Sequence, residues 1–217
     1  MKIKAVLFDL DGTLLDTSSG ILGALKEAIS ECGLSPIKKG DESIFIGPPM
    51  QKTIGEYYHL DKEKSMQIAN IFREKYKTHH FLLQAKLYDE IVPLLMELKK
   101  KNIKTAVATY KREDYALDLL NCFDLTKHFD VYHGSDADGK MSKSDIIEKC
   151  LAEMGVNKGQ TILLGDTNSD LQGAINAHCL FVGVTYGFGY KNKNDLPLDS
   201  IAVGIIDKPL ELLDLLD

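Results

Sequence analysis

Carboxylates end two apolar runs of this sequence, and their positions suggest a shared site. Asp9 and Asp11 follow the first run, and Asp166 and Asp170 follow a later one. In an open parallel sheet, ligands bind outside the carboxyl ends of the strands, so these four acids are expected at one edge. Such a cluster repels itself unless a cation joins it, and carboxylate oxygens favour Mg²⁺ completed by water and phosphate oxygens. The pattern predicts metal-assisted phosphoryl transfer.

The first pair of acids could divide the work of such a reaction. Asp9 could attack phosphorus as a nucleophile, while Asp11 gives a proton to the leaving oxygen. Gly12 would let the backbone turn away tightly after them. The structural alternative is that Asp-Gly marks a turn that Asp11 merely caps. For Asp166 and Asp170, the alternative is a capping pair at the start of a helix.

Short apolar runs alternate with helical periods over most of the chain. Each run is apolar at nearly every position, which is typical of strands in a sheet covered on both faces. The predicted strands lie at residues 5–8, 104–108, 129–132, 161–164, 180–184 and 200–203. The predicted helices between them lie at residues 90–101, 114–120 and 144–154. This alternation predicts an α/β fold with a parallel sheet and right-handed crossovers.

One long segment, residues 16–81, interrupts the alternation. It has helical periods at residues 21–32, 50–58 and 63–78, without a convincing strand. We therefore expect two domains: an α/β core at 1–15 and 82–217, and an all-helical insertion at 16–81. The insertion has nine basic and nine acidic residues, so the other 17 basic and 23 acidic residues give the core the whole acidic excess.

Composition excludes several classes of protein. Hydrophobic residues make up 44% and charged residues 27%, which predicts a folded chain. A net charge of −6 argues against a nucleic-acid partner. Neither residues 5–8 nor the charge-free stretch 171–190 has the pattern of a signal peptide or a membrane span. The four cysteines lie far apart, so we expect a reduced, cytoplasmic protein. Its oligomeric state is left open between a monomer and a homodimer.

Four segments resemble the motifs of the haloacid dehalogenase-like hydrolase superfamily. FDLDGTLLDT at residues 8–17 looks like the first motif, and AVAT at 106–109 is similar to the second. Lys143 resembles the lysine of the third motif, and GDTNSD at 165–170 matches the fourth, GDxxxD. The motifs follow in the family's order along essentially the whole chain. The resemblance implies a Rossmann-like core with an inserted helical cap, as in the phosphoglycolate phosphatase-like subgroup.

The resemblance also implies roles for these residues. Asp9 would form an aspartyl-phosphate, and Asp11 would act as acid and then as base for the hydrolytic water. Thr109, with backbone amides near Asp11, would cradle the phosphoryl oxygens, and Lys143 would neutralise the charge that gathers there. Mg²⁺ would be held by the metal ligands of the family pattern, which are Asp9, the backbone carbonyl of Asp11, Asp166 and, through water, Asp170.

The sequence departs from the family pattern near the third motif. The subgroup usually has Lys-Pro there, whereas this chain reads GKMSKSD at residues 139–145. We favour Lys143 as the motif lysine because it lies next to the predicted helix start, and Lys140 is the alternative.

Three further positions are candidates for substrate binding. Thr-Tyr-Lys at 109–111 replaces the usual Thr-Asn-Lys, so Tyr110 and Lys111 are expected near the substrate. Lys111 would contact an anionic group, and its alternative is a surface lysine. Gly47 lies in IGPPM at 46–50, which resembles a cap loop of the subgroup, and the alternative there is a proline at the first position of a helix.

The function predicted from this resemblance is Mg²⁺-dependent hydrolysis of a small phosphorylated metabolite, with phosphoglycolate as one candidate. The alternatives are a β-phosphoglucomutase-like sugar phosphate mutase, a 5′-nucleotidase-like phosphatase and a receiver-type phospho-acceptor switch. Asp11 argues against the switch, since a switch must keep its phosphoryl group. It also argues against dehalogenation, since the dehalogenase members resemble the rest but lack that acid.

Overall fold

A computed structural model describes residues 2–78, 80–136, 140–196 and 201–216. The chain divides into two compact units, one formed by Met1–Leu15 with Leu87–Asp217 and the other by Asp16–Lys86. Residues 82–86, which we expected in the core, group with the helical unit. None of the described helices is long and apolar enough to cross a membrane.

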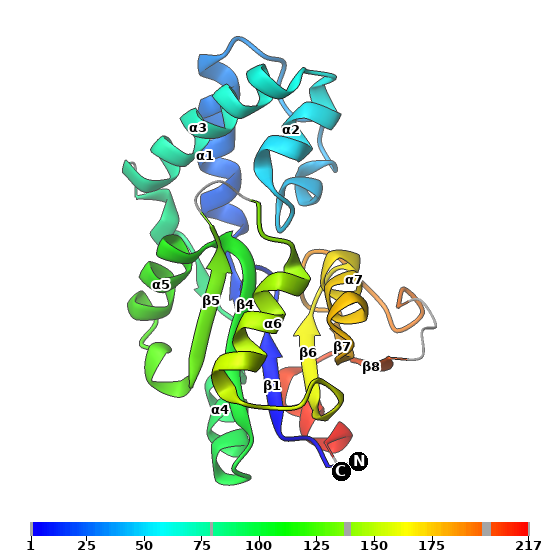
Figure 1. The fold of residues 1–217 in the computed structure, drawn as a ribbon. Coiled ribbons are helices and arrows are strands. Elements are labelled where there is room, and N and C mark those ends of the chain that lie inside the picture. The colour runs from blue at the N-terminus through cyan, green and yellow to red at the C-terminus, as the bar shows by residue number, and fades with distance from the viewer. Residues whose placement is uncertain (1, 79, 137–139, 197–200, 217) are drawn as a thin grey trace. The chain divides into compact units, whose positions relative to one another are not determined.

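The first unit is built on a six-stranded sheet in the order β5-β4-β1-β6-β7-β8 (Figure 1). All neighbouring strands in it are parallel, which confirms the predicted α/β fold. The strands are β1 (Ala5–Phe8), β4 (Lys104–Arg112), β5 (Val131–Ser135), β6 (Thr161–Gly165), β7 (Leu180–Val184) and β8 (Ala202–Ile206).

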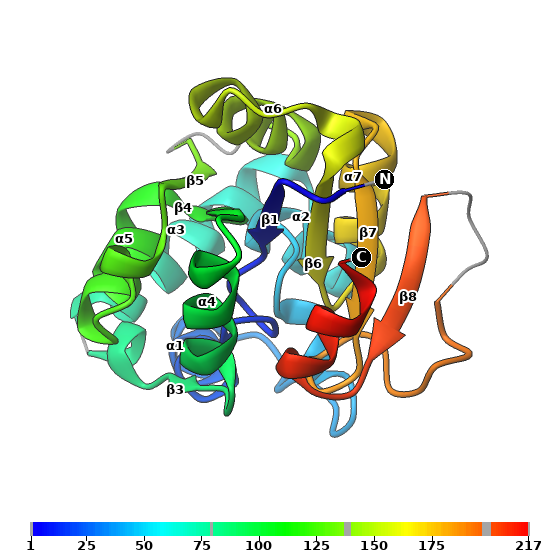
Figure 2. The ribbon, with the colours of Figure 1, turned by 90° about the horizontal axis from the view of Figure 1, so that it is seen from below.

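Helices cover both faces of this sheet, which explains why β1 is apolar at every position. Figure 2 shows α6 (Lys143–Met154) and α7 (Asn168–Ala177) on one face, with α4 (Ile91–Lys100) and α5 (Glu113–Cys122) on the other. All four residues of β1 are fully buried. Such two-sided burial removes the alternation of apolar and polar residues seen in half-exposed strands.

Three of the strands differ from the sequence prediction by more than one residue. β4 runs to Arg112 rather than ending at Ala108. β5 begins at Val131 rather than Phe129, whose ring packs edge-on against Phe8 at 5.8 Å. The strand then continues through His133, which contacts Glu113 and Glu153 through its two ring nitrogens. The last strand is β8 at Ala202–Ile206, and the first residue predicted for it lies outside the described residues.

Capping boxes fix the starts of the two helices nearest the site. Ser142 precedes α6 and accepts the N–H of Asp145, whose carboxylate accepts the N–H of Ser142. Thr167 and Asp170 make the same exchange at α7. A side-chain oxygen at this position satisfies one of the free N–H groups of the first turn. The box places Lys143 as the first residue of α6.

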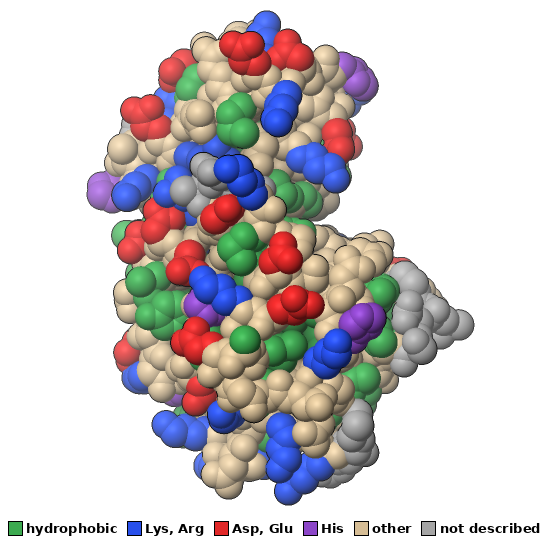
Figure 3. Space-filling view, viewed as in Figure 1, with side chains coloured by type: hydrophobic (Ala, Val, Ile, Leu, Met, Phe, Trp, Pro, Cys, Tyr) green, Lys and Arg blue, Asp and Glu red, His purple; other side chains and the backbone are tan. Residues whose placement is uncertain are grey.

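The second unit contains α1 (Ser18–Glu31), α2 (Met50–Tyr58) and α3 (Lys62–Thr78), as the helical prediction for this segment expected. Tyr76, Phe45 and Ile54 are among its fully buried side chains. The chain enters and leaves it through two short strands, β2 (Leu15–Asp16) and β3 (Lys86–Leu87), which pair with each other. On the face drawn in Figure 3, acidic and basic side chains of the described residues are interspersed.

Candidate active site

The end of β1 places the first two acids. The Asp9 N–H donates to Leu164 O of β6 at 2.9 Å, so Asp9 leaves the sheet between β4 and β6. Gly12 follows with a φ of +86°, a conformation that glycine adopts at little cost, and the chain turns there. The Asp9 and Asp11 side chains are both buried, although they belong to a turn. The predicted turn is therefore present, and it holds two buried carboxylates.

Asp9, Asp166 and Asp170 converge from the ends of β1 and β6. One carboxylate oxygen of each lies within 4.8 Å of the others, and all three residues are buried. Among the described residues, Asp166 Oδ1 is one of two buried side-chain polar atoms without a hydrogen-bond partner. Burying a carboxylate oxygen without a partner is costly, so this atom requires a cation or a donor. The oxygen-only donor set suits Mg²⁺.

The other oxygen of Asp166 is held by the loop after β7. Asp166 Oδ2 accepts the N–H of Phe188 at 2.6 Å and that of Gly189 at 3.3 Å. A Cβ on Gly187 would lie 2.4 Å from Asp166 Cβ and 2.3 Å from Gly12 O. The glycine therefore allows the loop to approach, and the loop amides fix the carboxylate. Sequence reasoning did not find this contact between the loop and Asp166.

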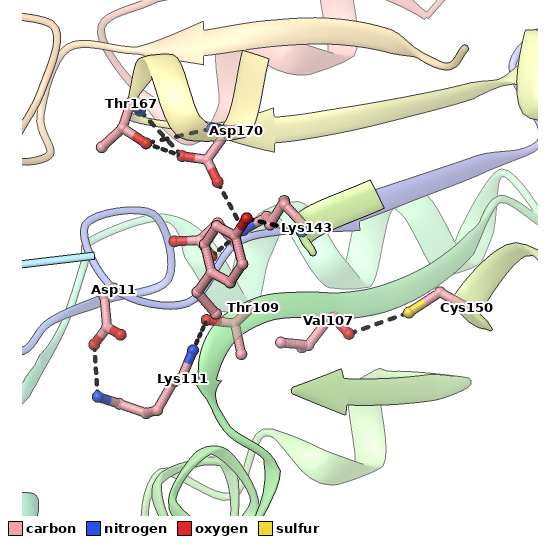
Figure 4. Close-up of polar contacts among 10 residues, drawn as sticks. Asp11, Val107, Thr109, Lys111, Lys143, Cys150, Thr167 and Asp170 are labelled. Atoms are coloured by element: carbon pink, nitrogen blue, oxygen red, sulfur yellow. Dashed lines mark hydrogen bonds and ion pairs between the residues drawn. The ribbon is translucent and has the colours of Figure 1, made fainter. Parts of the chain in front are cut away.

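Asp170 both caps the start of α7 and belongs to the acid cluster. Its Oδ2 accepts the Thr167 N–H at 3.1 Å and the Thr167 hydroxyl at 2.7 Å, while its Oδ1 lies 2.7 Å from Lys143 Nζ. The capping alternative is therefore correct for Asp170, without removing it from the site (Figure 4). It does not apply to Asp166, which precedes the cap residue.

Lys143 is the cation inside this cluster. Its side chain is 2% exposed, and its Nζ lies 2.5 Å from Asp9 Oδ1. Lys140, the alternative, is exposed, and its backbone N–H donates to Asp136. The structure thus brings Lys143 to Asp9.

Burial and the neighbouring charges together set the direction of the pKa shifts in the cluster. Burial raises the pKa of Asp9 to about 7; Lys143 opposes that shift, while Asp170 and Asp11 add to it. Burial, followed by Asp170 and Asp9, raises the pKa of Asp166 well above its ordinary value. Burial alone would lower the pKa of Lys143, but Asp170 and Asp9 raise it above its ordinary value. Three carboxylates facing one ammonium leave two charges for a divalent cation.

The end of β4 supplies the remaining predicted residues of this unit. Thr109 is buried, and its Oγ1 accepts the Lys111 N–H at 3.1 Å. Lys111 Nζ lies 3.1 Å from Asp11 Oδ1, and each of these side chains is 6% exposed (Figure 4). Lys111 is therefore not a surface lysine. The Tyr110 hydroxyl accepts the Lys143 N–H at 2.9 Å, a contact between β4 and α6 that sequence reasoning did not find.

Gly47 lies in the helical unit, apart in sequence from the others. It has a φ of +101° and precedes α2, whose cap residue is Pro49. The proline therefore stands just before the helix and not at its first position. A role for Gly47 in substrate binding stays a prediction.

Comparison with known proteins finds a matching family model and several similar proteins. The model of the haloacid dehalogenase-like hydrolases matches residues 6–184. The chain is 34% identical over 189 residues to the tyrosine-protein kinase PtkA of Mycobacterium tuberculosis, covering 86% of this chain and 63% of that kinase. It is 30% identical over 194 residues to a 5′-nucleotidase of Pseudomonas aeruginosa, covering 89% and 87%.

A solved structure agrees with these matches. The crystal structure of a predicted phosphatase from Clostridium acetobutylicum superimposes with a TM-score of 0.89 at 31% identity, covering 99% of this chain and 98% of that one. The four motifs, their arrangement at the sheet edge and these matches lead to one conclusion: the chain belongs to the haloacid dehalogenase-like hydrolase family.

Proposed function

We propose that this protein is a Mg²⁺-dependent phosphatase that hydrolyses a small phosphomonoester through an aspartyl-phosphate on Asp9. One observation carries the proposal: a buried Asp9 bonded to Lys143 lies beside Asp166, whose Oδ1 has no partner. A nucleophile, a fixed positive charge and a cation ligand are thus within one small cluster. These are the parts that phosphoryl transfer requires.

The chain's own residues would carry the reaction in two steps. An Asp9 carboxylate oxygen bonds to phosphorus while the bond from phosphorus to the leaving oxygen breaks, and Asp11 gives its proton to that oxygen. Asp11 then takes a proton from water as the water oxygen attacks phosphorus, which releases phosphate and restores Asp9. Thr109 donates to a phosphoryl oxygen, and Lys143 balances the charge on Asp9 and the phosphoryl group.

The ligands of Mg²⁺ would be Asp9, Asp166 and the backbone carbonyl of Asp11. Asp170 fits a contact through water, since Lys143 and Thr167 already occupy its two oxygens. When bound, the ion neutralises the acids and the incoming phosphoryl group.

Lys111 is the proposed contact on the leaving-group side, and Gly47 of the helical unit remains a substrate contact proposed from its sequence. An anionic group of the substrate at Lys111 would compete with Asp11 for the ammonium. A phosphorylated acid such as 2-phosphoglycolate has the required second charge. We propose a cytoplasmic location, which suits the four free thiols.

Release of phosphate from a panel of esters tests this function. The panel contains 2-phosphoglycolate, 5′-nucleoside monophosphates, sugar phosphates and pyrophosphate, each with Mg²⁺ and with EDTA. Hydrolysis should require the metal, and Asp9→Asn should lower kcat by a factor on the order of 10³ or more. Asp118→Asn, an exposed aspartate on α5, is the matched control.

Two results would contradict the proposal. Absence of phosphate release together with a stable, acid-labile phosphoprotein after acetyl phosphate would indicate a phospho-acceptor switch. Interconversion of sugar phosphates without release would indicate a mutase.

A further inference from the structure

Tyr110 contacts both ends of Lys143. Its hydroxyl accepts the Lys143 backbone N–H at 2.9 Å, and Lys143 Nζ lies 5.7 Å from the centre of its ring. That distance is within the range of a cation–π contact. One side chain from β4 therefore touches the backbone and the ammonium of a residue on α6.

The hydroxyl contact fills a need of the helix. The first N–H groups of an α-helix have no partner within the helix, and Lys143 is the first residue of α6. The capping box uses the N–H groups of Ser142 and Asp145. The Tyr110 hydroxyl takes the Lys143 N–H, which the box leaves open. The start of α6 is thereby tied to the end of β4.

A glycine on α7 leaves the space for the Lys143 side chain. A Cβ on Gly173 would lie 2.4 Å from Lys143 Cγ and 2.9 Å from its Cβ. Contacts this short do not occur, so a side chain here would move the lysine. The stem of Lys143 is thus limited by α7, while its ammonium lies between Asp9 and Asp170.

We propose that Tyr110 is a positioning residue that holds the Lys143 ammonium at Asp9, and that it does not select the leaving group. The hydroxyl fixes the backbone of Lys143, the ring lies beside its ammonium, and Gly173 leaves its path open. This inference rests on the proposed phosphatase function and replaces the substrate-binding role expected for Tyr110 from its neighbours in the sequence.

The kinetics of Tyr110→Phe and Tyr110→Leu test it with two esters of different leaving group, p-nitrophenyl phosphate and the best ester of the panel. The Phe variant keeps the ring and loses the hydroxyl, so kcat should fall about tenfold for both esters, with KM within about twofold. The kcat of the Leu variant should fall further, because this variant loses the ring as well as the hydroxyl. A rise in KM for one ester alone would show contact with the leaving group and overturn the inference.

A double-mutant cycle removes the ambiguity of a structural effect. Tyr110→Phe should lower kcat in the wild type but have almost no further effect on Lys143→Met, because the hydroxyl acts through the lysine. Equal losses in both backgrounds would overturn the inference. Thr105→Val is the control, since Thr105 lies at the other end of the same strand. The change removes the hydrogen bond that the Thr105 hydroxyl donates to His128 O at 2.7 Å. Its kcat should match the wild type.

A second variant changes the residue of α7 that faces the Lys143 side chain. Gly173→Ala gains helix propensity, but its Cβ would lie 2.4 Å from Lys143 Cγ and displace the lysine. The inference expects Gly173→Ala to lower kcat in the wild type and to have almost no further effect on Lys143→Met.

If the wild type releases no phosphate from any ester, the proposed function fails, and the contact is tested by unfolding alone. Tyr110→Phe and Lys143→Met should then show non-additive shifts in Tm. Additive shifts would overturn the positioning role.

Discussion

The three clustered acids differ in what each carboxylate oxygen contacts. Asp9 is bonded to Lys143, Asp170 is shared between Lys143 and Thr167, and Asp166 keeps one oxygen unpartnered. Burial raises the pKa of Asp9 from 3.8 to about 7. A carboxyl whose pKa is higher in the folded chain than in the unfolded chain loses folding free energy as it ionises. The metal-free protein should therefore become less stable as pH rises from about 4 to about 7.

Asp166→Asn tests this prediction, because it removes a buried charge and keeps an oxygen for the loop amides. In EDTA at pH 7.5, the variant should unfold about 2–4 °C above the wild type, equivalent to about 1 kcal/mol. At pH 5 the difference should shrink, and Mg²⁺ should raise Tm in the wild type far more than in the variant. Thermal unfolding of Asp118→Asn is the control. A variant less stable than the wild type at pH 7.5 would disprove the repulsion argument.

At the scale of elements, the loop at 186–190 holds the proposed metal ligand Asp166 through its backbone amides. Gly187→Ala should displace it, because the added Cβ would meet Gly12 O at 2.3 Å and Asp166 Cβ at 2.4 Å. We expect Mg²⁺ affinity, measured by calorimetry, to fall about tenfold or more, as for other residues that orient metal ligands. Gly159→Ala is the matched control, since a Cβ on Gly159 would lie 3.4 Å from Asn157 Oδ1, an ordinary van der Waals contact. An unchanged Kd in Gly187→Ala would show that the amides do not position Asp166.

The elements also show where sequence reasoning succeeds. β1 could be predicted because it is buried on both faces, and the acids after it follow from the strand end. Lys143 could be separated from Lys140 by a signal already in the sequence, since Ser142 and Asp145 form a capping box that starts the helix. β5 is predicted, but its start is placed two residues too early, because the apolar Phe129 packs against Phe8 before the strand begins. The contact of Tyr110 with Lys143 joins distant segments, and no local pattern reports it.

At the scale of the whole molecule, only one of the two compact units contains the proposed metal ligands. Asp9, Asp11, Asp166 and Asp170 all belong to the α/β unit, and none of these acids lies in Asp16–Lys86. A ligand that binds only the folded site stabilises it, by about 2.7 kcal/mol at 100 times its Kd. Hydrogen exchange should therefore slow with Mg²⁺ in β1 and β6, by up to about a hundredfold for amides that exchange only through unfolding of that unit.

Amides of α1 and α3 provide the comparison within the same molecule. If the helical unit opens independently, their exchange should change little with Mg²⁺, because local opening of that unit leaves the ligands in place. The measurement is exchange by mass spectrometry with Mg²⁺ and with EDTA, and Asp166→Asn should abolish the difference in β1 and β6. Equal protection of α1 and β1 would contradict independent opening. It would mean that the helical unit and the α/β unit unfold as one cooperative structure, so that metal binding stabilises the entire chain.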